Sequence, residues 1–205
     1  HSGGMGVLMR RYPQLNAFSN TGTWKYLEET GKIGCLPKDQ INVIEPGQTK
    51  YYVDFEVTAF ATSHDAAQPQ YYVFSSGGKR LACLTDTGYV SEEVEYEIQD
   101  ADAYLLEFNY DDLMLRSGPY PWSLQQRVRS DHGHLSNEQA AETLARVISS
   151  KTKHVFMAHR SQQNNLNYLA RDVAEEVLAA RDADVASDLE LHDTEPMTPS
   201  SLINL

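Results

Sequence analysis

Four apolar segments of this sequence each end in a histidine or a carboxylate, the side chains that hold divalent metals. The residues concerned are His64 after residues 51–62, Asp86 after 80–85, Glu107 within 103–108 and His159 after 154–158. Apolar runs of this length, alternating in the first case, predict β-strands. Ligands gather at one set of strand ends in layered sheets, because the sheet fixes the loops that begin there. Jointly, the two histidines and Asp86 predict a site for Zn²⁺ or Mn²⁺.

Each of these residues has a simpler explanation when it is taken singly. An isolated histidine at a strand end is more often a hydrogen-bonded structural residue than a ligand. Asp86 precedes Thr-Gly, a place where an aspartate usually caps its own turn, and Glu107 could be solvated. Only the joint occurrence of the four favours a metal site.

His134 lies just before the predicted start of a helix. Ser136 and Gln139 have the spacing of a capping box, which opens a helix over residues 137–149. The free backbone N–H groups and the positive dipole end of such a start suit a phosphate. His134 could therefore donate a proton to a phosphate oxygen, and an ordinary polar loop is the alternative.

The remaining elements must position these side chains. Hairpins are predicted early in the chain, one of them turning at residues 75–78, and strands alternate with helices later. This order indicates a layered α/β protein with a mixed sheet. Further helices are predicted over residues 3–12, 21–30, 91–99, 110–131 and 164–181, and further strands over 16–20, 41–45 and 71–74.

Composition limits the class of protein. A chain of 205 residues with 41% hydrophobic content suffices for one domain. The formal net charge of −12 argues against binding nucleic acid by bulk positive charge. No apolar run has the length of a membrane helix, and Cys35 and Cys83 are expected to be reduced thiols, which predicts a cytoplasmic protein with no membrane partner.

The last 24 residues differ in composition from the rest. They contain six acidic residues and no lysine or arginine. We therefore predict one folded domain over residues 1–181 and an acidic, disordered tail over 182–205.

Several motifs occur together in a fixed order: "TSHDAA", "LTDTGYV", "LLEFNYD", "SGPYPW", "GHLSNEQAA" and "AHRSQQNN". In this order the sequence resembles the YycJ/WalJ (VicX) branch of the metallo-β-lactamase-fold hydrolases over about residues 1–180. The resemblance implies an α/β fold, a metallo-β-lactamase-like αββα sandwich with mixed sheets.

The resemblance also bears on the start of the chain. "HSGGMGVLMRRY" is similar to the last histidine of the family's His-x-His-x-Asp-His motif and the helix after it. His1 would then be a metal ligand, and the first strands and most of the motif would be missing from an N-terminally truncated sequence. Such a chain is expected to bind at most one metal tightly and to be almost inactive. The alternative is that His1 is the remnant of a tag.

Roles carry over from the family onto matching positions. His64 and His159 resemble histidine ligands, and Asp86 resembles the carboxylate that bridges two metals. Glu107 and His134 resemble a pair in which the carboxylate orients an imidazole that assists the phosphate or the departing oxygen. Asp65 and Ser161 are expected to orient ligands from outside the first coordination shell. The candidates for contacting the substrate are Arg127, Arg129, Arg160, Tyr120 and Trp122.

By this resemblance the protein is a metal-dependent phosphodiesterase, in the form of a 5′→3′ DNA exonuclease that uses hydroxide activated by two Zn²⁺ or Mn²⁺ ions. Two alternatives stay open, because one fold hosts many chemistries. One is a metallohydrolase of a small phosphodiester or thioester, and the other is a metal-binding accessory protein of a bacterial two-component signalling system. The Glu107–His134 pair favours a phosphodiester substrate, since a thioesterase would not need it.

Overall fold

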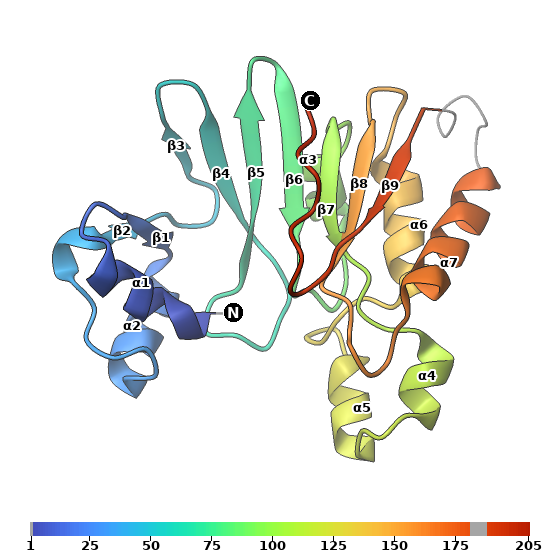
Figure 1. The fold of residues 1–205 in the computed structure, drawn as a ribbon, viewed down its shortest axis with the longest axis horizontal. Coiled ribbons are helices and arrows are strands. Elements are labelled where there is room, and N and C mark those ends of the chain that lie inside the picture. The colour runs from blue at the N-terminus through green and yellow to red at the C-terminus, as the bar shows by residue number, and fades with distance from the viewer. Residues whose placement is uncertain (1, 181–187) are drawn as a thin grey trace.

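The computed structural model describes residues 2–180 and 188–205, which form an α/β fold around a large mixed sheet (Figure 1). The helices are η1 (Ser2–Gly4), α1 (Met5–Arg11), α2 (Thr21–Thr30), η2 (Lys38–Gln40), α3 (Glu92–Ile98), α4 (Asp112–Ser117), α5 (Trp122–Val128), α6 (Asn137–Val147) and α7 (Asn167–Ala179). The strands are β1 (Ala17–Ser19), β2 (Ile41–Val43), β3 (Thr49–Tyr51), β4 (Glu56–Ala61), β5 (Gln70–Ser76), β6 (Lys79–Leu84), β7 (Ala103–Glu107), β8 (His154–Ala158) and β9 (Glu190–Asp193). Within these two ranges, no helix combines the length and the apolar character that crossing a bilayer requires.

In the described part of the chain, β3 to β9 form a seven-stranded sheet whose strands lie in sequence order. The strands from β3 to β6 pair antiparallel, and those from β6 to β9 pair parallel. Because β4 and β6 both run opposite to β5, β4 points the same way as the parallel strands. The carboxyl ends of β4, β6, β7 and β8 therefore meet at one edge of the sheet, and the predicted mixed sheet is confirmed. β1 and β2 form a separate parallel pair.

The main core lies between the sheet and helices α6 and α7 (Figure 1). Leu84, Leu106 and Met157 project from three neighbouring strands and are at most 1% exposed, as are Leu144 of α6 and Ala174 of α7. Side chains alternate between the two faces of a strand. Burying these side chains against the helices therefore fixes how each strand is oriented where it ends. The core thereby sets where the loops after β6, β7 and β8 begin.

The start of α6 is fixed by the predicted capping box, which is present. The Ser136 hydroxyl accepts a hydrogen bond from the backbone N–H of Gln139 at 3.2 Å. The Gln139 side chain accepts one from the backbone N–H of Ser136 at 2.9 Å. These bonds satisfy two backbone donors that the helix cannot pair internally, and they fix the loop that carries His134.

The structure corrects the strand predicted over residues 51–62. β3 ends at Tyr51, the backbone N–H of Tyr52 donates to the Phe55 carbonyl at 2.8 Å, and the chain returns as β4 from Glu56. The apolar alternation therefore continues through a turn around Asp54. A single strand would have been about twice as long as β4.

The prediction of a disordered acidic tail is wrong for Glu190–Asp193, which form β9. This strand pairs parallel with β8, with Val155 opposite Leu191 and Met157 opposite Asp193. The Asp193 carboxylate of this strand accepts a hydrogen bond from the Arg171 guanidinium of α7 at 2.8 Å. The last strand is thus held by neighbours that lie far away in sequence, while residues 182–187 lie outside the described residues.

Asp102 is a buried carboxylate at the start of β7, at the opposite end of that strand from Glu107. It is 1% exposed and accepts hydrogen bonds from Lys79 at 3.0 Å and from the backbone N–H of Arg80 at 2.9 Å, and it forms an ion pair with Lys151 at 3.1 Å. Burial raises the pKa of Asp102, but the bonds to these donors outweigh burial and lower it below the usual 3.8. The carboxylate therefore stabilises the folded chain in its charged form.

We expect Asp102→Asn to lower the free energy of unfolding at neutral pH by about 2 kcal/mol, because hydrogen bonds to a charged acceptor are lost. A depressed folded-state pKa adds stability that is present above the unfolded value and lost as pH falls through the folded value. Urea unfolding of the original and variant proteins should thus differ near pH 7, and the difference should shrink as the pH falls below the usual aspartate pKa of 3.8. A difference that stays constant with pH would contradict this account, and Asp172→Asn on the exposed side of α7 is the control.

Candidate metal centre

Four of the predicted site residues lie together at the carboxyl edge of the sheet. His64 follows β4, Asp86 follows β6, His159 follows β8, and His134 precedes α6. The Nε2 atoms of His64 and His159 each lie 3.6 Å from the same oxygen, Oδ1 of Asp86. The ring of His134 is centred 5.0 Å from that of His64 and 5.2 Å from that of His159. We call these four residues, together with Glu107, the candidate metal centre.

Glu107 is hydrogen-bonded to three residues of this group: His134, His159 and Asp86. Its Oε2 accepts hydrogen bonds from Nδ1 of His134 at 3.0 Å, from Nδ1 of His159 at 2.5 Å and from the backbone N–H of Asp86 at 3.0 Å. Its Oε1 accepts one from the backbone N–H of Leu135 at 2.9 Å. Burial alone would raise the pKa of Glu107, which has no exposed surface, but the bonds from the two histidines outweigh burial and lower it to about 2. The carboxylate is therefore ionised across the physiological range.

The hydrogen bonds also determine which nitrogen of each histidine is placed to bind a metal. Nδ1 of His64 contacts the Gly133 carbonyl at 2.9 Å, while Nδ1 of His134 and Nδ1 of His159 contact Glu107. Because a carbonyl and a carboxylate only accept, each Nδ1 carries the proton. Each Nε2 is then the atom that can bind a metal, which is the arrangement that hydrogen-bonded histidine ligands commonly have.

Two of these residues have a backbone conformation that is rare outside glycine. Asp86 has a φ of 58° and His159 a φ of 53°, which lies in the left-handed region. The backbone of Asp86 is held by its bond to Glu107, and the carbonyl of His159 accepts a bond from the Asn109 amide at 2.8 Å. Such conformations persist where the surroundings determine them and concentrate at functional sites.

The loops that carry His64 and His134 are tied to each other. The Ser63 hydroxyl donates to the Asp131 carbonyl at 2.7 Å, and the backbone N–H of Asp65 donates to the His132 carbonyl at 3.0 Å. A Cβ atom at Gly133 would lie 2.2 Å from the Val128 carbonyl oxygen, so the turn that leads from α5 to His134 requires glycine. These two hydrogen bonds therefore hold the loops of His64 and His134 against each other.

The donor atoms fit a divalent metal ion. Ligand atoms of Asp86, Glu107, His134 and His159 all lie within 4.8 Å of one another. Tetrahedral zinc with nitrogen and oxygen ligands places neighbouring donors about 3.3 Å apart, close to the 3.6 Å between the histidine nitrogens and Asp86. His64, Asp86 and His159 would hold the ion, because Oε2 of Glu107 already accepts three hydrogen bonds.

The predicted supporting residues lie in different surroundings. Oδ1 of Asp65 is 3.4 Å from Nε2 of His64, and the Asp65 carboxylate also binds Arg127, whose hydrogen bond lowers its pKa. The Ser161 hydroxyl instead accepts a hydrogen bond from the backbone N–H of Asn164 at 3.2 Å, within the turn after β8. A role in orienting ligands stays a prediction for both residues.

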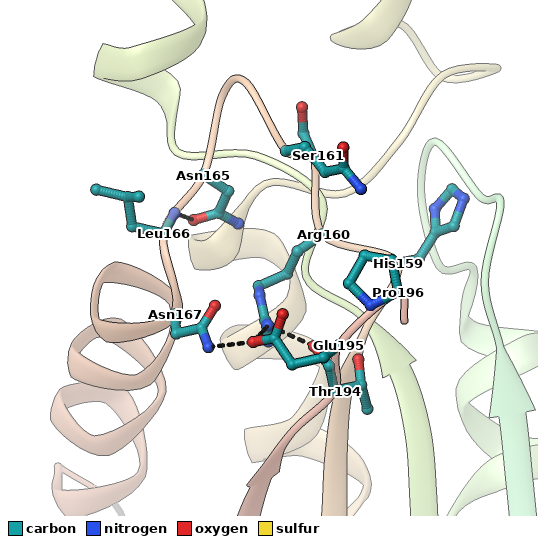
Figure 2. Close-up of a pocket in the computed structure, with 10 residues that line it drawn as sticks. His159, Arg160, Ser161, Asn165, Leu166, Asn167, Thr194, Glu195 and Pro196 are labelled. Carbon is teal, nitrogen blue, oxygen red and sulfur yellow. Dashed lines mark hydrogen bonds and ion pairs between the residues drawn. The ribbon is translucent and has the colours of Figure 1, made fainter. Parts of the chain in front are cut away.

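Arg160, which was predicted to contact a phosphate, is instead paired with the C-terminal segment in this structure. Its side chain is 8% exposed and lies 3.4 Å from Asp193 and 3.5 Å from Glu195. It also donates to the Thr194 carbonyl at 2.6 Å. Figure 2 shows this guanidinium pointing at Thr194 and Glu195 of the C-terminal segment. Arg160 and His159 both line a cleft of about 630 Å³. Asp193, which lies opposite Met157 in the sheet, and Glu195, just after β9, neutralise this charge. The guanidinium is therefore directed toward the C-terminal segment.

The other substrate candidates differ in how accessible they are. Arg127 is bound to Asp65, and Arg129 lies 3.2 Å from Asp112. Tyr120 packs against a small apolar cluster around Leu115, which indicates a structural role. Trp122 is 70% exposed and available for contact. His1 lies outside the described residues.

Sequence reasoning missed three buried asparagines that support the centre. Asn109 binds the His159 carbonyl, and the side chains of Asn137 and Asn165 bind each other at 2.8 and 3.0 Å. Asn165 also donates to the Phe108 carbonyl at 2.9 Å, which links the start of α6 to the end of β7. The signal available in the sequence was their position inside the motifs "LLEFNYD", "GHLSNEQAA" and "AHRSQQNN".

Comparison with known proteins agrees with this geometry. Residues 1–159 match the family model described as the beta-lactamase superfamily domain. The chain is 43% identical over 202 residues to exodeoxyribonuclease YycJ of Bacillus anthracis, covering 98% of this chain and 75% of the relative. It is 40% identical over 205 residues to exodeoxyribonuclease WalJ of Streptococcus pneumoniae D39, covering 100% of this chain and 76% of that relative.

A solved structure shows the same fold. The metallo-beta-lactamase fold protein YhfI of Bacillus subtilis superposes with a TM-score of 0.68 at 15% identity, covering 95% of this chain and 70% of that protein. The fold is therefore that of the metallo-β-lactamase class, in which divalent metal sites are general. The chain belongs to the metallo-β-lactamase superfamily and, within it, to the YycJ/WalJ family.

We expect Glu107→Gln to weaken Co²⁺ or Zn²⁺ binding by about 10- to 100-fold, because the histidines lose the carboxylate that orients them. Isothermal titration with each metal measures the effect. Glu142→Gln, an exposed position on α6, is the control that should leave affinity unchanged. An unaltered affinity in Glu107→Gln would show that the hydrogen bonds do not organise the centre.

Proposed function

We propose that the full-length protein is a metal-dependent phosphodiesterase that acts on DNA as a 5′→3′ exonuclease with two divalent ions, Zn²⁺ or Mn²⁺, and that the candidate metal centre contributes ligands to them. The observation that carries the proposal is the bond from His134 to the buried Glu107, placed beside the His64–Asp86–His159 group. Both relatives named above are exodeoxyribonucleases by name, which supports DNA as the substrate. The 5′→3′ direction of digestion is proposed from the family resemblance.

His134 is suited to act on the phosphate group itself. Its Nδ1 proton is held by Glu107, and its ring lies at the N-terminal side of α6 while remaining 18% exposed. The ionised Glu107 accepts the Nδ1 hydrogen bond and so keeps the ring oriented, with Nε2 turned away from the carboxylate. His134 can therefore donate from Nε2 to a phosphoryl or departing oxygen. When bound, the divalent ions polarise the phosphoryl group and lower the pKa of water.

Local positive charge reconciles DNA binding with an acidic chain. Arg127 is 57% exposed even though it is paired with Asp65, so a phosphate could share its guanidinium. Arg129 lies two residues further on, paired with Asp112. We propose that these residues and Trp122, which together lie on and just after α5, contact the nucleic acid strand.

The purified full-length protein should degrade DNA with added Mn²⁺ and lose activity with a chelator. His134→Ala should lower kcat by roughly 10²- to 10⁴-fold, the usual contribution of a general acid, while metal content stays intact. His64→Ala is the matched variant and should lose metal as well as activity. Full nuclease activity in His134→Ala with metal content unchanged would overturn the assigned role, and absence of any nuclease activity would favour the accessory protein.

Trp122→Ala should weaken binding of single-stranded DNA by about 1–3 kcal/mol, the contribution of one base stacked on an aromatic ring. The free energy of unfolding should not change, because the side chain is 70% exposed. Fluorescence anisotropy with a labelled oligonucleotide measures the affinity. Tyr96→Ala on α3, 71% exposed, is the control, and equal losses in both variants would argue against a specific contact.

Two wider predictions belong to the same proposal. The free thiols of Cys35 and Cys83 are consistent with the reducing cytoplasm. A functional link to a two-component signalling system stays a prediction, supported only by the family to which the chain belongs.

A further inference from the structure

A second group of metal-binding side chains lies at the opposite end of β8 from the candidate metal centre. It consists of His154, the first residue of β8, and Glu190 and His192 of β9. His154 and His159 are five residues apart along an extended strand, which separates the two groups by about 16 Å. One metal ion cannot bridge that distance, so the two groups are distinct.

Strand register brings the three residues to one face. His154 lies opposite Glu190, and Phe156 lies opposite His192 in the parallel pair of β8 and β9. Side chains two apart on a strand share a face, so all four of these residues project in the same direction. The His192 ring stacks on Phe156 with centroids 4.6 Å apart and planes 20° apart, which fixes the direction of its nitrogen.

The donor atoms have the separations of a metal site. Nδ1 of His154 lies 3.0 Å from Nε2 of His192, and the Glu190 Oε2 lies 3.6 Å from each of these nitrogens. Tetrahedral zinc with two nitrogens and one oxygen places its ligands about 3.3 Å apart. The three atoms thus form one face of a coordination tetrahedron, and the fourth position is left for water.

A hydrogen bond between the two histidines is the simpler explanation, and it accounts for less of the geometry. That bond uses one proton between Nδ1 of His154 and Nε2 of His192 and needs no third group. Glu190 nevertheless lies at equal distance from both nitrogens, beyond hydrogen-bond range of either, although its side chain is 67% exposed and could extend into water.

We propose that His154, Glu190 and His192 bind one divalent transition-metal ion, of which Zn²⁺ is the best match to two imidazoles and a carboxylate. The ion joins β9 to β8 and so attaches the C-terminal strand to the sheet. Because β9 contributes only four residues, a cross-link at its start and middle adds to a short ladder of hydrogen bonds. The site is structural, since it lies away from the residues of the proposed nuclease.

The test uses Co²⁺, whose visible absorption reports tetrahedral coordination, and Zn²⁺ measured by elemental analysis after dialysis. Asp86→Asn and His159→Asn together disable the candidate metal centre. We expect this double variant to retain one equivalent of metal, and the further change His192→Gln to remove it. Glu190→Gln, at a position whose side chain is 67% exposed, should weaken the same affinity at least tenfold, while Glu176→Gln on α7 should have no effect.

Binding of Zn²⁺ can also be followed without replacing a histidine. On addition of Zn²⁺, the ¹⁵N resonances of His154 and His192 should shift, and the melting temperature should rise in the original chain more than in Glu190→Gln. The proposal is overturned if the double variant binds no metal, or if Glu190→Gln and His192→Gln, with circular dichroism unchanged, keep the full equivalent.

Discussion

Glu107 accepts four hydrogen bonds in a place that water does not reach, and the candidate metal centre depends on them. Two come from histidine rings, one from the backbone N–H of Asp86 and one from the backbone N–H of Leu135, just before α6. A buried carboxylate without partners would be costly, so the charge requires these four donors and in turn fixes their positions. One side chain thus sets the tautomers, ring directions and backbone path of residues that come from separate parts of the chain.

The direction of the strands explains how these residues meet. β4 belongs to the antiparallel half of the sheet and β6 to β8 to the parallel half, yet all four end at the same edge. Their loops therefore converge, and the core beneath them keeps the edge rigid. The buried pair of Asn137 and Asn165 extends this rigidity to the helix start beside His134.

Local signals were sufficient for part of this arrangement. The strand ends with their histidines and carboxylates, the mixed sheet and the capping box at Ser136 could be predicted, because each depends on neighbouring residues. The burial of Arg160 could not, since its partners Asp193 and Glu195 come from an acidic segment whose composition indicated disorder. Pairing of β9 with β8 is a long-range contact, and four residues carry too little periodicity to reveal it. The hydrogen bond between Glu107 and His159 could not be predicted either, because it joins residues 52 positions apart in the chain.

The left-handed backbone at Asp86 and His159 restricts which side chains these two positions tolerate. Asparagine, aspartate and glycine enter this conformation more readily than alanine, and β-branched residues are strained in it. A scan of substitutions would therefore mix two effects, the loss of a ligand atom and the distortion of the loop. Asparagine separates them, because it removes the ligand while leaving the main chain where it is. Valine or isoleucine would instead move the neighbouring ligands as well, so defects of that kind would say little about coordination chemistry.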